Sequence, residues 1–365
     1  MDQLYKIALS FLPKINADFV FNMQEKGVTP EEIFTMSSSE VSNALQIDEN
    51  QFSLNNREEA VSRAEVELKF MKRHSIRAYY LGDRDYPNLL RETATPPVIL
   101  YQLGEGDLQS DHIISIVGTR KCTAYGYNFC KQLVDYLTPA YSDLIVVSGL
   151  AYGIDEAAHE ASLSCGCKTV GVLAHGLDMI YPAAHRNLAQ RILKAGGCLL
   201  TEYPSGEKPY RQRFLERNRI VATISNGVVV VESDVKGGAM STASIAFSYS
   251  RDVLALPGKL SDKVSSGCNL LIRQHKADII TCPEDVEHSL MWESDRAVQP
   301  QKSLFPEIEG DAKIIYDILL THEKATIDMV KELSGLHISK VMEILTEMEL
   351  DDIVIRHPGN RFTIL

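Results

Sequence analysis

The hydrophobic pattern of residues 1–75 is helical. Apolar residues recur there at spacings of three and four, which is typical of amphipathic helices. Thr29 directly precedes Pro30, and this pair predicts a helix start with Thr29 as the N-cap. The predicted helices include Leu4–Phe11, Asp18–Met23 and Arg57–His74. We therefore expect a small helical module over residues 1–75.

The pattern changes over residues 76–295. Short valine-rich runs, flanked by glycine, alternate there with amphipathic helical patterns. Runs that are apolar throughout, without strict alternation, are typical of parallel strands buried on both faces. The sequence therefore predicts a doubly wound α/β domain with a parallel, Rossmann-like sheet. The predicted strands are Ile113–Val117, Leu144–Val147, Thr169–Leu173, Cys198–Thr201, Gly227–Val231 and Val253–Leu256.

A polar stretch with two prolines, Pro300 and Pro306, predicts a linker over residues 296–310. Residues 311–365 then show three helical patterns followed by two short strand patterns around His357–Asn360. Three helices and a two-stranded hairpin predict a winged helix. Its predicted elements are Lys313–Leu320, Ile327–Leu333, Ile338–Met348, Ile353–Arg356 and Arg361–Ile364.

Charge is distributed unevenly along these modules. Residues 1–75 carry 8 Lys/Arg and 12 Asp/Glu, a net charge of −4, and residues 307–365 carry 6 and 12, a net charge of −6. Because the whole chain has a net charge of −12, residues 76–306, the middle of the chain, have a net charge of only −2. Within the middle, Lys208–Arg219 contains five Lys/Arg and one Glu, a local charge of +4, together with Phe214. Cations that follow phosphates and a ring that stacks a base are the requirements of single-stranded nucleic acid. The alternative is a solvated helix start that happens to be basic.

Composition narrows the class of protein. With 45% hydrophobic and 24% charged residues the chain is expected to be globular. It shows no leader pattern and no apolar run near the ~20 residues of a membrane span, so we expect a cytoplasmic protein without membrane contact. Seven cysteines lack a Cys-x-x-Cys pair, which favours reduced thiols over a metal site. The chain also lacks G-x-G-x-x-G, so no dinucleotide cofactor is expected.

Two predicted strand ends carry phosphate-binding chemistry. Gly118, Thr119 and Arg120 follow the first strand of the middle domain. Glycine allows close backbone approach, the amides at the following helix start attract an anion, and Arg120 adds a cation. An ordinary tight turn would account for Gly118 but not for Arg120. A second glycine-rich turn follows Val231 and contains Lys236, Gly237, Gly238, Ser241 and Thr242.

Other strand ends offer fewer functional residues. Asp155 and His159 follow the second strand, in Ser148-Gly-Leu-Ala-Tyr-Gly-Ile-Asp155 and the next helix. The interpretation that we favour is structural: Asp155 caps the helix and His159 packs in the core.

Taken together, these motifs resemble the DprA/Smf family of DNA-processing proteins of bacterial transformation. Thr119 stands where the family has Ser, and Leu215 where it has Pro. The resemblance implies that residues 1–75 form a module of the SAM or helix-hairpin-helix type. This module carries Leu12–Asn16 where helix-hairpin-helix relatives have glycines, which argues against DNA contact there. The matching motifs are Val117-Gly-Thr-Arg120 with Tyr125-Gly126, Ser148–Asp155 with Ala158-His159, Gly176-Leu-Asp178 with Tyr181-Pro182, Thr201-Glu-Tyr-Pro204, Arg217-Asn-Arg219, Leu256-Pro-Gly258 and Gly267–Ile272.

The resemblance implies a non-enzymatic protein with an extended Rossmann-like domain, which binds single-stranded DNA, protects it and loads the RecA recombinase as a homodimer. It also implies roles for individual residues. Arg120, Arg211, Arg217, Arg219 and Lys236 would contact phosphates, and Phe214 would stack a base. The implied DNA-binding set is Gly118, Thr119, Arg120, Arg211, Phe214, Arg217, Asn218, Arg219, Lys236, Gly237, Gly238, Ser241 and Thr242.

Two other classes of protein remain. The first is a nucleoside-monophosphate phosphoribohydrolase of the lysine-decarboxylase-like fold, whose glycine turn is followed by a functional Glu. No Glu occupies the positions after Gly238 here, although Glu202 and Glu232 are available carboxylates at strand ends. The second is a protein-binding scaffold, which the basic run argues against. The winged helix is expected not to bind DNA, because its third helix has Lys340 against Glu343 and Glu347.

Overall fold

The structure is a computed structural model that describes residues 2–47, 52–293, 310–322, 325–350, 353–357 and 361–364. The chain divides into two compact units, Met1–Ser294 and Asp295–Leu365. The predicted linker lies outside the described residues except for Gly310, and so does the hairpin turn after His357.

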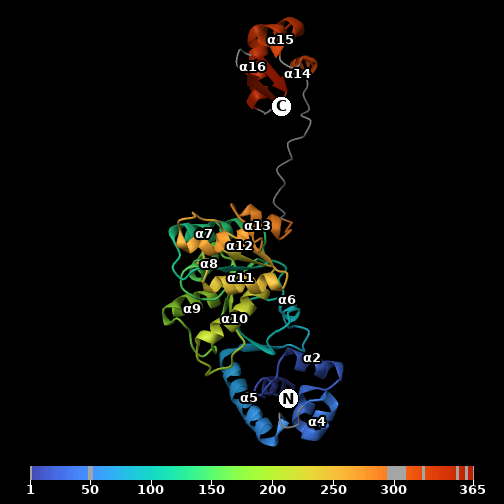
Figure 1. The fold of residues 1–365 in the computed structure, drawn as a ribbon, viewed down its shortest axis with the longest axis vertical. Coiled ribbons are helices and arrows are strands. Elements are labelled where there is room, and N and C mark those ends of the chain that lie inside the picture. The colour runs from blue at the N-terminus through green and yellow to red at the C-terminus, as the bar shows by residue number, and fades with distance from the viewer. Residues whose placement is uncertain are drawn as a thin grey trace. The chain divides into compact units, whose positions relative to one another are not determined.

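Helices fill the N-terminal part of the first unit, as predicted (Figure 1). Thr29 caps its helix in a capping box, in which Glu32 returns a hydrogen bond to the Thr29 amide at 2.8 Å. One helix, α4, was not predicted, because its sequence is rich in serine and only Val41 and Leu45 are buried. The helices are α1 (Asp2–Leu9), α2 (Ala17–Glu25), α3 (Pro30–Thr35), α4 (Ser38–Leu45) and α5 (Leu54–His74).

A nine-stranded sheet forms the centre of this unit, in the order β1-β2-β6-β5-β4-β3-β7-β8-β9. The strands from β6 to β9 pair in parallel, and β1 and β2 add an antiparallel edge. The sequence did not predict β1, β2 or β9, since polar residues such as Arg77 and Gln102 interrupt the first two and β9 has only two residues. The strands are β1 (Ile76–Tyr80), β2 (Ile99–Gly104), β3 (Ile113–Val117), β4 (Ile145–Ser148), β5 (Lys168–Val172), β6 (Cys198–Thr201), β7 (Gly227–Val230), β8 (Asp252–Ala255) and β9 (Asp278–Ile279).

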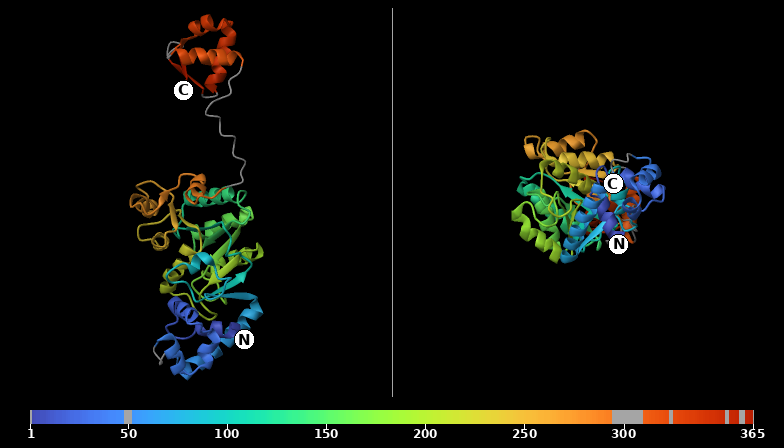
Figure 2. Two further views of the ribbon diagram at one scale, coloured as in Figure 1. Left: turned by 90° about the vertical axis from the view of Figure 1, so that its right-hand side faces the viewer. Right: turned by 90° about the horizontal axis from the view of Figure 1, so that it is seen from below.

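Helices cover both faces of the sheet (Figure 2). Alternate residues of β3 enter opposite cores: Ile113 packs with one helix layer, and Ile114 and Ile116 with the other. The first layer has α10 (Arg211–Thr223), α11 (Gly238–Ser248) and α12 (Ser266–Arg273), and the second has α7 (Ala124–Leu137), α8 (Ile154–Cys165), α9 (Arg186–Lys194) and α13 (Glu284–Ser289). Shorter segments are α6 (Asn88–Arg91), η2 (Ala183–His185) and η3 (Lys263–Ser265).

The strand order has a switch point between β3 and β7. From β3 the chain builds outward through β4, β5 and β6, and then returns to place β7 on the other side of β3. The helices that follow β3 and β7, α7 and α11, therefore lie on opposite faces of the sheet. This arrangement leaves a crevice at the carboxyl ends of the two strands, where ligands bind in open α/β sheets.

The second unit is a winged helix with its own core, as predicted. Its sheet has the order β10-β12-β11, so a two-residue strand joins the predicted hairpin. The elements are α14 (Asp311–Thr321), β10 (Ala325–Thr326), α15 (Ile327–Ser334), α16 (Ile338–Leu350), β11 (Val354–His357) and β12 (Arg361–Ile364).

The separate cores predict two independent unfolding transitions. Leu345 on α16 is 1% exposed, so Leu345→Ala should destabilise the winged helix by about 2–5 kcal/mol. Differential scanning calorimetry of the full chain should show that only one transition moves. The control is Leu350→Ala on the same helix, where Leu350 is 77% exposed and the change should stay within about 0.5 kcal/mol. A single transition that shifts as a whole would contradict the separation into two units.

Candidate nucleic-acid interface

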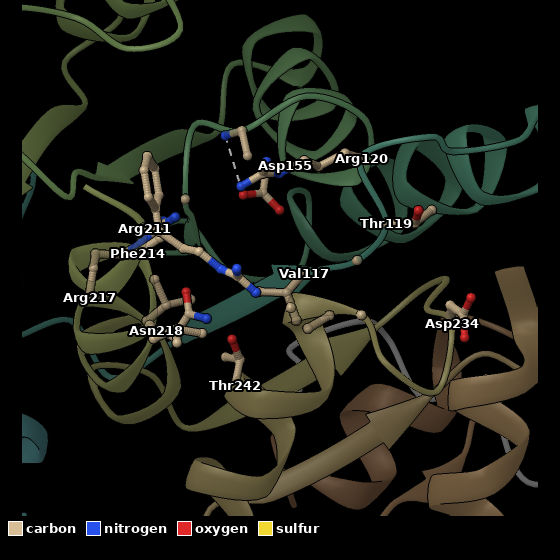
Figure 3. Close-up of a pocket in the computed structure, with 18 of the residues that line it drawn as sticks. Val117, Thr119, Arg120, Asp155, Arg211, Phe214, Arg217, Asn218, Asp234 and Thr242 are labelled. Carbon is tan, nitrogen blue, oxygen red and sulfur yellow. Dashed lines mark hydrogen bonds between the residues drawn. The ribbon is translucent and has the colours of Figure 1, made fainter. Parts of the chain in front are cut away.

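A cavity of about 740 Å³ opens at the switch point of the sheet. The loops after β3, β4 and β7 and the first turns of α10 and α11 build its wall (Figure 3). All the predicted site residues line it except Arg219 and Ser241. Residues that were not predicted also line it: Val117, Gly149, Ala151, Asp155, Tyr181, Pro209, Leu215, Val221, Asp234 and Ala239.

Three exposed cations surround the cavity: Arg120 after β3, Arg211 at the start of α10 and Lys236 before α11. None of the three forms a salt bridge with a described residue. Within the described part of the chain, α10 and α11 also begin without a side-chain cap, so their first backbone amides keep their capacity for an anion. The lining has two acidic residues: Asp155, which is 8% exposed, and Asp234, with which Lys263 pairs at 3.4 Å. The cavity is therefore suited to anionic groups such as phosphates.

Phe214 lines this cavity and is half-buried. Its ring lies 5.7 Å from the ring of Tyr181, and the guanidinium carbon of Arg120 lies 5.8 Å from its centroid. Phe214 belongs to none of the hydrophobic cores of the described residues. An aromatic ring beside a cation in an open cavity is the arrangement that stacks an unpaired base.

Arg217 corrects an expectation from the sequence. We expected it to face solvent or ligand, but it is 5% exposed and forms part of the cavity floor. Its Nη1 donates a hydrogen bond to the carbonyl of Val172 at 2.9 Å. Gly149 lies so close that a Cβ at that position would overlap the guanidinium. Arg217 therefore holds α10 against the ends of β4 and β5.

Arg219 and Ser241 were expected in the same site and lie outside it. The guanidinium of Arg219 pairs with Glu202 and donates to the carbonyl of Thr95 at 2.6 Å, in a separate cavity of about 290 Å³. Arg213 of the same run pairs with Glu207. The +4 charge of Lys208–Arg219 is thus directed to several faces of α10, and only part of it faces the cavity.

His159 packs in the core, as predicted, but the prediction that Asp155 caps α8 is wrong, because the N-cap of that helix is Gly153. Asp155 reaches back to the amide of Ala151 at 3.3 Å and lines the cavity floor. Burial raises the pKa of Asp155, and the charge of Arg217 opposes this shift. His159 is fully buried, shares a hydrogen bond with Thr169 at 2.7 Å, and burial lowers its pKa to about 3.

Glu232 and Glu202, the two carboxylates considered for hydrolysis, form hydrogen bonds and ion pairs outside the cavity. Glu232 is 1% exposed and accepts hydrogen bonds from the amide and hydroxyl of Thr123, at 2.8 and 2.6 Å. It thereby holds the N-cap of α7 beside β7, and neither Glu232 nor Glu202 lines the cavity. The amide of Thr119 donates to the carbonyl of Glu232 at 2.6 Å, so this amide is not available to a ligand.

The N-terminal module holds one rim of the cavity through α5. Glu67 is 4% exposed, and its carboxylate accepts from the amide of Ser205 at 3.0 and 3.2 Å and from the Ser205 hydroxyl. Ser205 lies in the loop that leads to Pro209 and Arg211 on the cavity wall. Isolated carboxylates in helices give no sequence pattern for such a contact, so the sequence did not predict it.

Two further observations concern the described residues only. No helix among them is long and apolar enough to span a membrane. They contain no group of three or more His, Cys, Asp or Glu side chains arranged to hold a metal ion.

The structure is that of an extended Rossmann-like protein with a cavity bordered by exposed cations at the switch point of its sheet, and with a winged helix as a second unit. Residues 77–291 match the family described as DNA recombination-mediator protein A, and residues 299–360 match the DprA winged helix domain. The chain therefore belongs to the DprA/Smf family of DNA-processing proteins.

Individual relatives agree with this assignment. The putative DNA processing protein DprA of Mycobacterium tuberculosis is 36% identical over 305 residues, which are 80% of this chain and 77% of the relative. The X-ray structure of DprA from Streptococcus pneumoniae has a TM-score of 0.58 and 29% identity, and covers 75% of this chain and 98% of its own. DNA processing protein A from Helicobacter pylori has a TM-score of 0.53 and 30% identity over 59% of this chain and 95% of its own. That structure is described as giving insight into a unique single-stranded DNA binding mode.

The burial of Arg217 predicts that it contributes to stability. Arg217→Ala should lower the free energy of unfolding by about 2–4 kcal/mol, because it leaves Asp155 without its nearby cation and the Val172 carbonyl without its donor. The control is Arg211→Ala at an exposed position of the same helix, α10. This substitution should change the free energy of unfolding by less than about 0.5 kcal/mol. Urea denaturation of both variants measures the difference. Equal stability of the two variants would contradict the structural role of Arg217.

Proposed function

We propose that this protein binds single-stranded DNA in the cavity at the switch point of the sheet. The observation that carries the proposal is the position of Phe214, whose ring lies in the cavity beside Arg120 and Tyr181. A ring inside a cavity is able to stack only on a base that has left the duplex. Phosphates on either side of that base would meet the exposed cations and the uncapped helix starts.

The roles proposed for the site residues follow their positions. Arg120, Arg211 and Lys236 contact phosphates, and Asn218 and Thr242 supply polar groups to the wall. The turns at Gly118 with Thr119 and at Gly237 with Gly238 allow the DNA backbone to approach closely. Ser241 takes a place at the start of α11 rather than in the wall, while Arg217 and Arg219 support α10. Sequence preference is weak in such a site, because stacking and phosphate contacts tolerate every base.

The wider role that we propose comes from the family. The protein protects incoming single-stranded DNA in the cytoplasm and loads RecA onto it during transformation or recombination, acting as a homodimer without catalysis. RecA filament assembly on DNA coated with single-strand-binding protein tests the loading step directly. Analytical ultracentrifugation tests the dimer.

Salt dependence provides the first test of DNA binding. Arg120, Arg211 and Lys236 form no salt bridge with a described residue, and three phosphate contacts at about 0.7 each predict a slope of log affinity on log salt near −2 for oligo-dT. Arg120→Ala should weaken binding to all sequences alike and make this slope shallower by about 0.7. Fluorescence anisotropy at several salt concentrations gives both quantities.

The matched control is Arg73→Ala, which removes an exposed arginine at the end of α5, away from the cavity lining. Its affinity and slope should equal those of the wild type. Duplex of the same length should bind more weakly than oligo-dT. A slope near zero, or a preference for duplex, would refute the proposed function.

The winged helix is proposed to contact protein rather than DNA. Lys340 of α16 is paired with Glu343 at 3.0 Å, and Glu347 follows on the same helix, so this surface repels phosphates. Deleting residues 307–365 should leave the affinity for oligo-dT equal or higher. A large loss of affinity in the truncated protein, with its remaining thermal transition intact, would show that the module binds DNA.

A further inference from the structure

Two exposed tyrosines lie at the ends of strands next to the cavity. Tyr181 follows β5 and is 48% exposed, and Tyr152 follows β4 and is 46% exposed. Tyr181 lines the cavity, where its ring meets that of Phe214. The ring of Tyr152 packs edge-on against His185, with the ring centroids 4.7 Å apart. His185 is the last residue of η2, and η2 begins two residues after Tyr181. Tyr152 therefore contacts the same chain segment that contains Tyr181.

Both tyrosines have rigid supports. The Tyr181 amide donates to Nε2 of His175 at 3.2 Å, and the other ring nitrogen of His175 bonds the Gly176 carbonyl at 2.8 Å. Since Nε2 accepts, the proton of neutral His175 is on Nδ1. His185, under Tyr152, bonds the Leu150 carbonyl through Nδ1 at 2.9 Å. Both imidazoles are buried, whereas the rings of the two tyrosines remain exposed.

We propose that Phe214, Tyr181 and Tyr152 form a base-stacking track, which leads single-stranded DNA from the cavity across the ends of β5 and β4. The ligand of the outer part of this track is an unpaired nucleobase. The inference rests on the proposed function, and it adds to that function a direction for the strand and a second and third stacking position.

The electrostatics of this side favour bases over phosphates as the recognised groups. Asp178 precedes Tyr181 in its loop, and Glu156 lies 3.4 Å from Nε2 of His185. Arg186 is an exposed cation next to His185. With two carboxylates beside one arginine, the tyrosines gain affinity from ring stacking and not from neutralising phosphates. Their removal should therefore weaken binding without changing its salt slope, unlike the removal of Arg120.

The central experiment is a thermodynamic cycle between a ring and the bases. Tyr181→Ala and Tyr152→Ala are each measured by anisotropy against oligo-dT and against an abasic strand of equal length, at low salt. Each variant should lose about 5-fold to 100-fold in affinity for oligo-dT, the loss that follows removal of one stacking ring. Neither should differ from the wild type on the abasic strand, because the partner of the ring is already absent.

The control is Tyr127→Ala on α7, because Tyr127 has a similar exposure of 46% but does not line the cavity. It should bind both strands as the wild type does. Tyr181→Phe keeps the ring and should restore the affinity for oligo-dT. A further measurement compares the affinities for oligo-dT strands of about 4 to about 16 nucleotides. Tyr152→Ala should weaken binding only of the longer strands, because these reach the outer part of the track.

The outcomes separate the inference from the proposed function. If wild-type protein fails to bind oligo-dT, the proposed function fails. If it binds, and both tyrosine variants match Tyr127→Ala, the track is refuted while the function stands. Losses that persist on the abasic strand would assign the rings a structural role and overturn the inference. Unchanged affinity with an altered oligomeric state would instead assign this surface to a second copy of the chain.

Discussion

The site depends on the buried guanidinium of Arg217. It connects three parts of the fold, since its helix is α10, its acceptor is the last carbonyl of β5, and Gly149 after β4 leaves it room. Burial lowers the pKa of Arg217 and raises that of Asp155, but a guanidinium starts high enough to remain charged. A positive charge, 5% exposed, thus forms part of the cavity floor. It orients the helix and adds a positive potential for any anion above it.

Two glycines near the cavity are required by the packing of the fold itself. Gly126 leaves space for the carboxylate of Glu232, whose hydrogen bonds to Thr123 fix the start of α7. A Cβ at Gly118 would overlap both Ile154 and the carbonyl of Glu232. The loops after β3 and β7 are therefore held together by backbone and carboxylate contacts. That leaves the side chains of Arg120 and Lys236 available on the outside of the turn.

The sequence predicted the parallel strands well, because complete burial on both faces gives valine-rich runs that few other structures produce. It predicted the site incompletely, because the total charge of Lys208–Arg219 does not show how the charged side chains are distributed around a helix. At 3.6 residues per turn, Arg211, Phe214 and Asn218 share the cavity face, whereas Arg213 and Arg219 point elsewhere and meet Glu207 and Glu202. The helical period was available in the sequence. The acidic partners were not, because they depend on tertiary contacts between distant segments.

The same reasoning explains why an acidic N-terminal module belongs to the unit that carries the site. Glu67 of α5 satisfies the amide and hydroxyl of Ser205, and Arg63 lies 3.8 Å from Glu207 in the same loop. This loop leads into the uncapped start of α10, so its conformation decides where Arg211 and the first amides of that helix lie. Loop backbone at a cavity rim has few hydrogen-bond partners of its own. A module with a net charge of −4 can thus serve a site for anions without touching the anion, by ordering the segment that does.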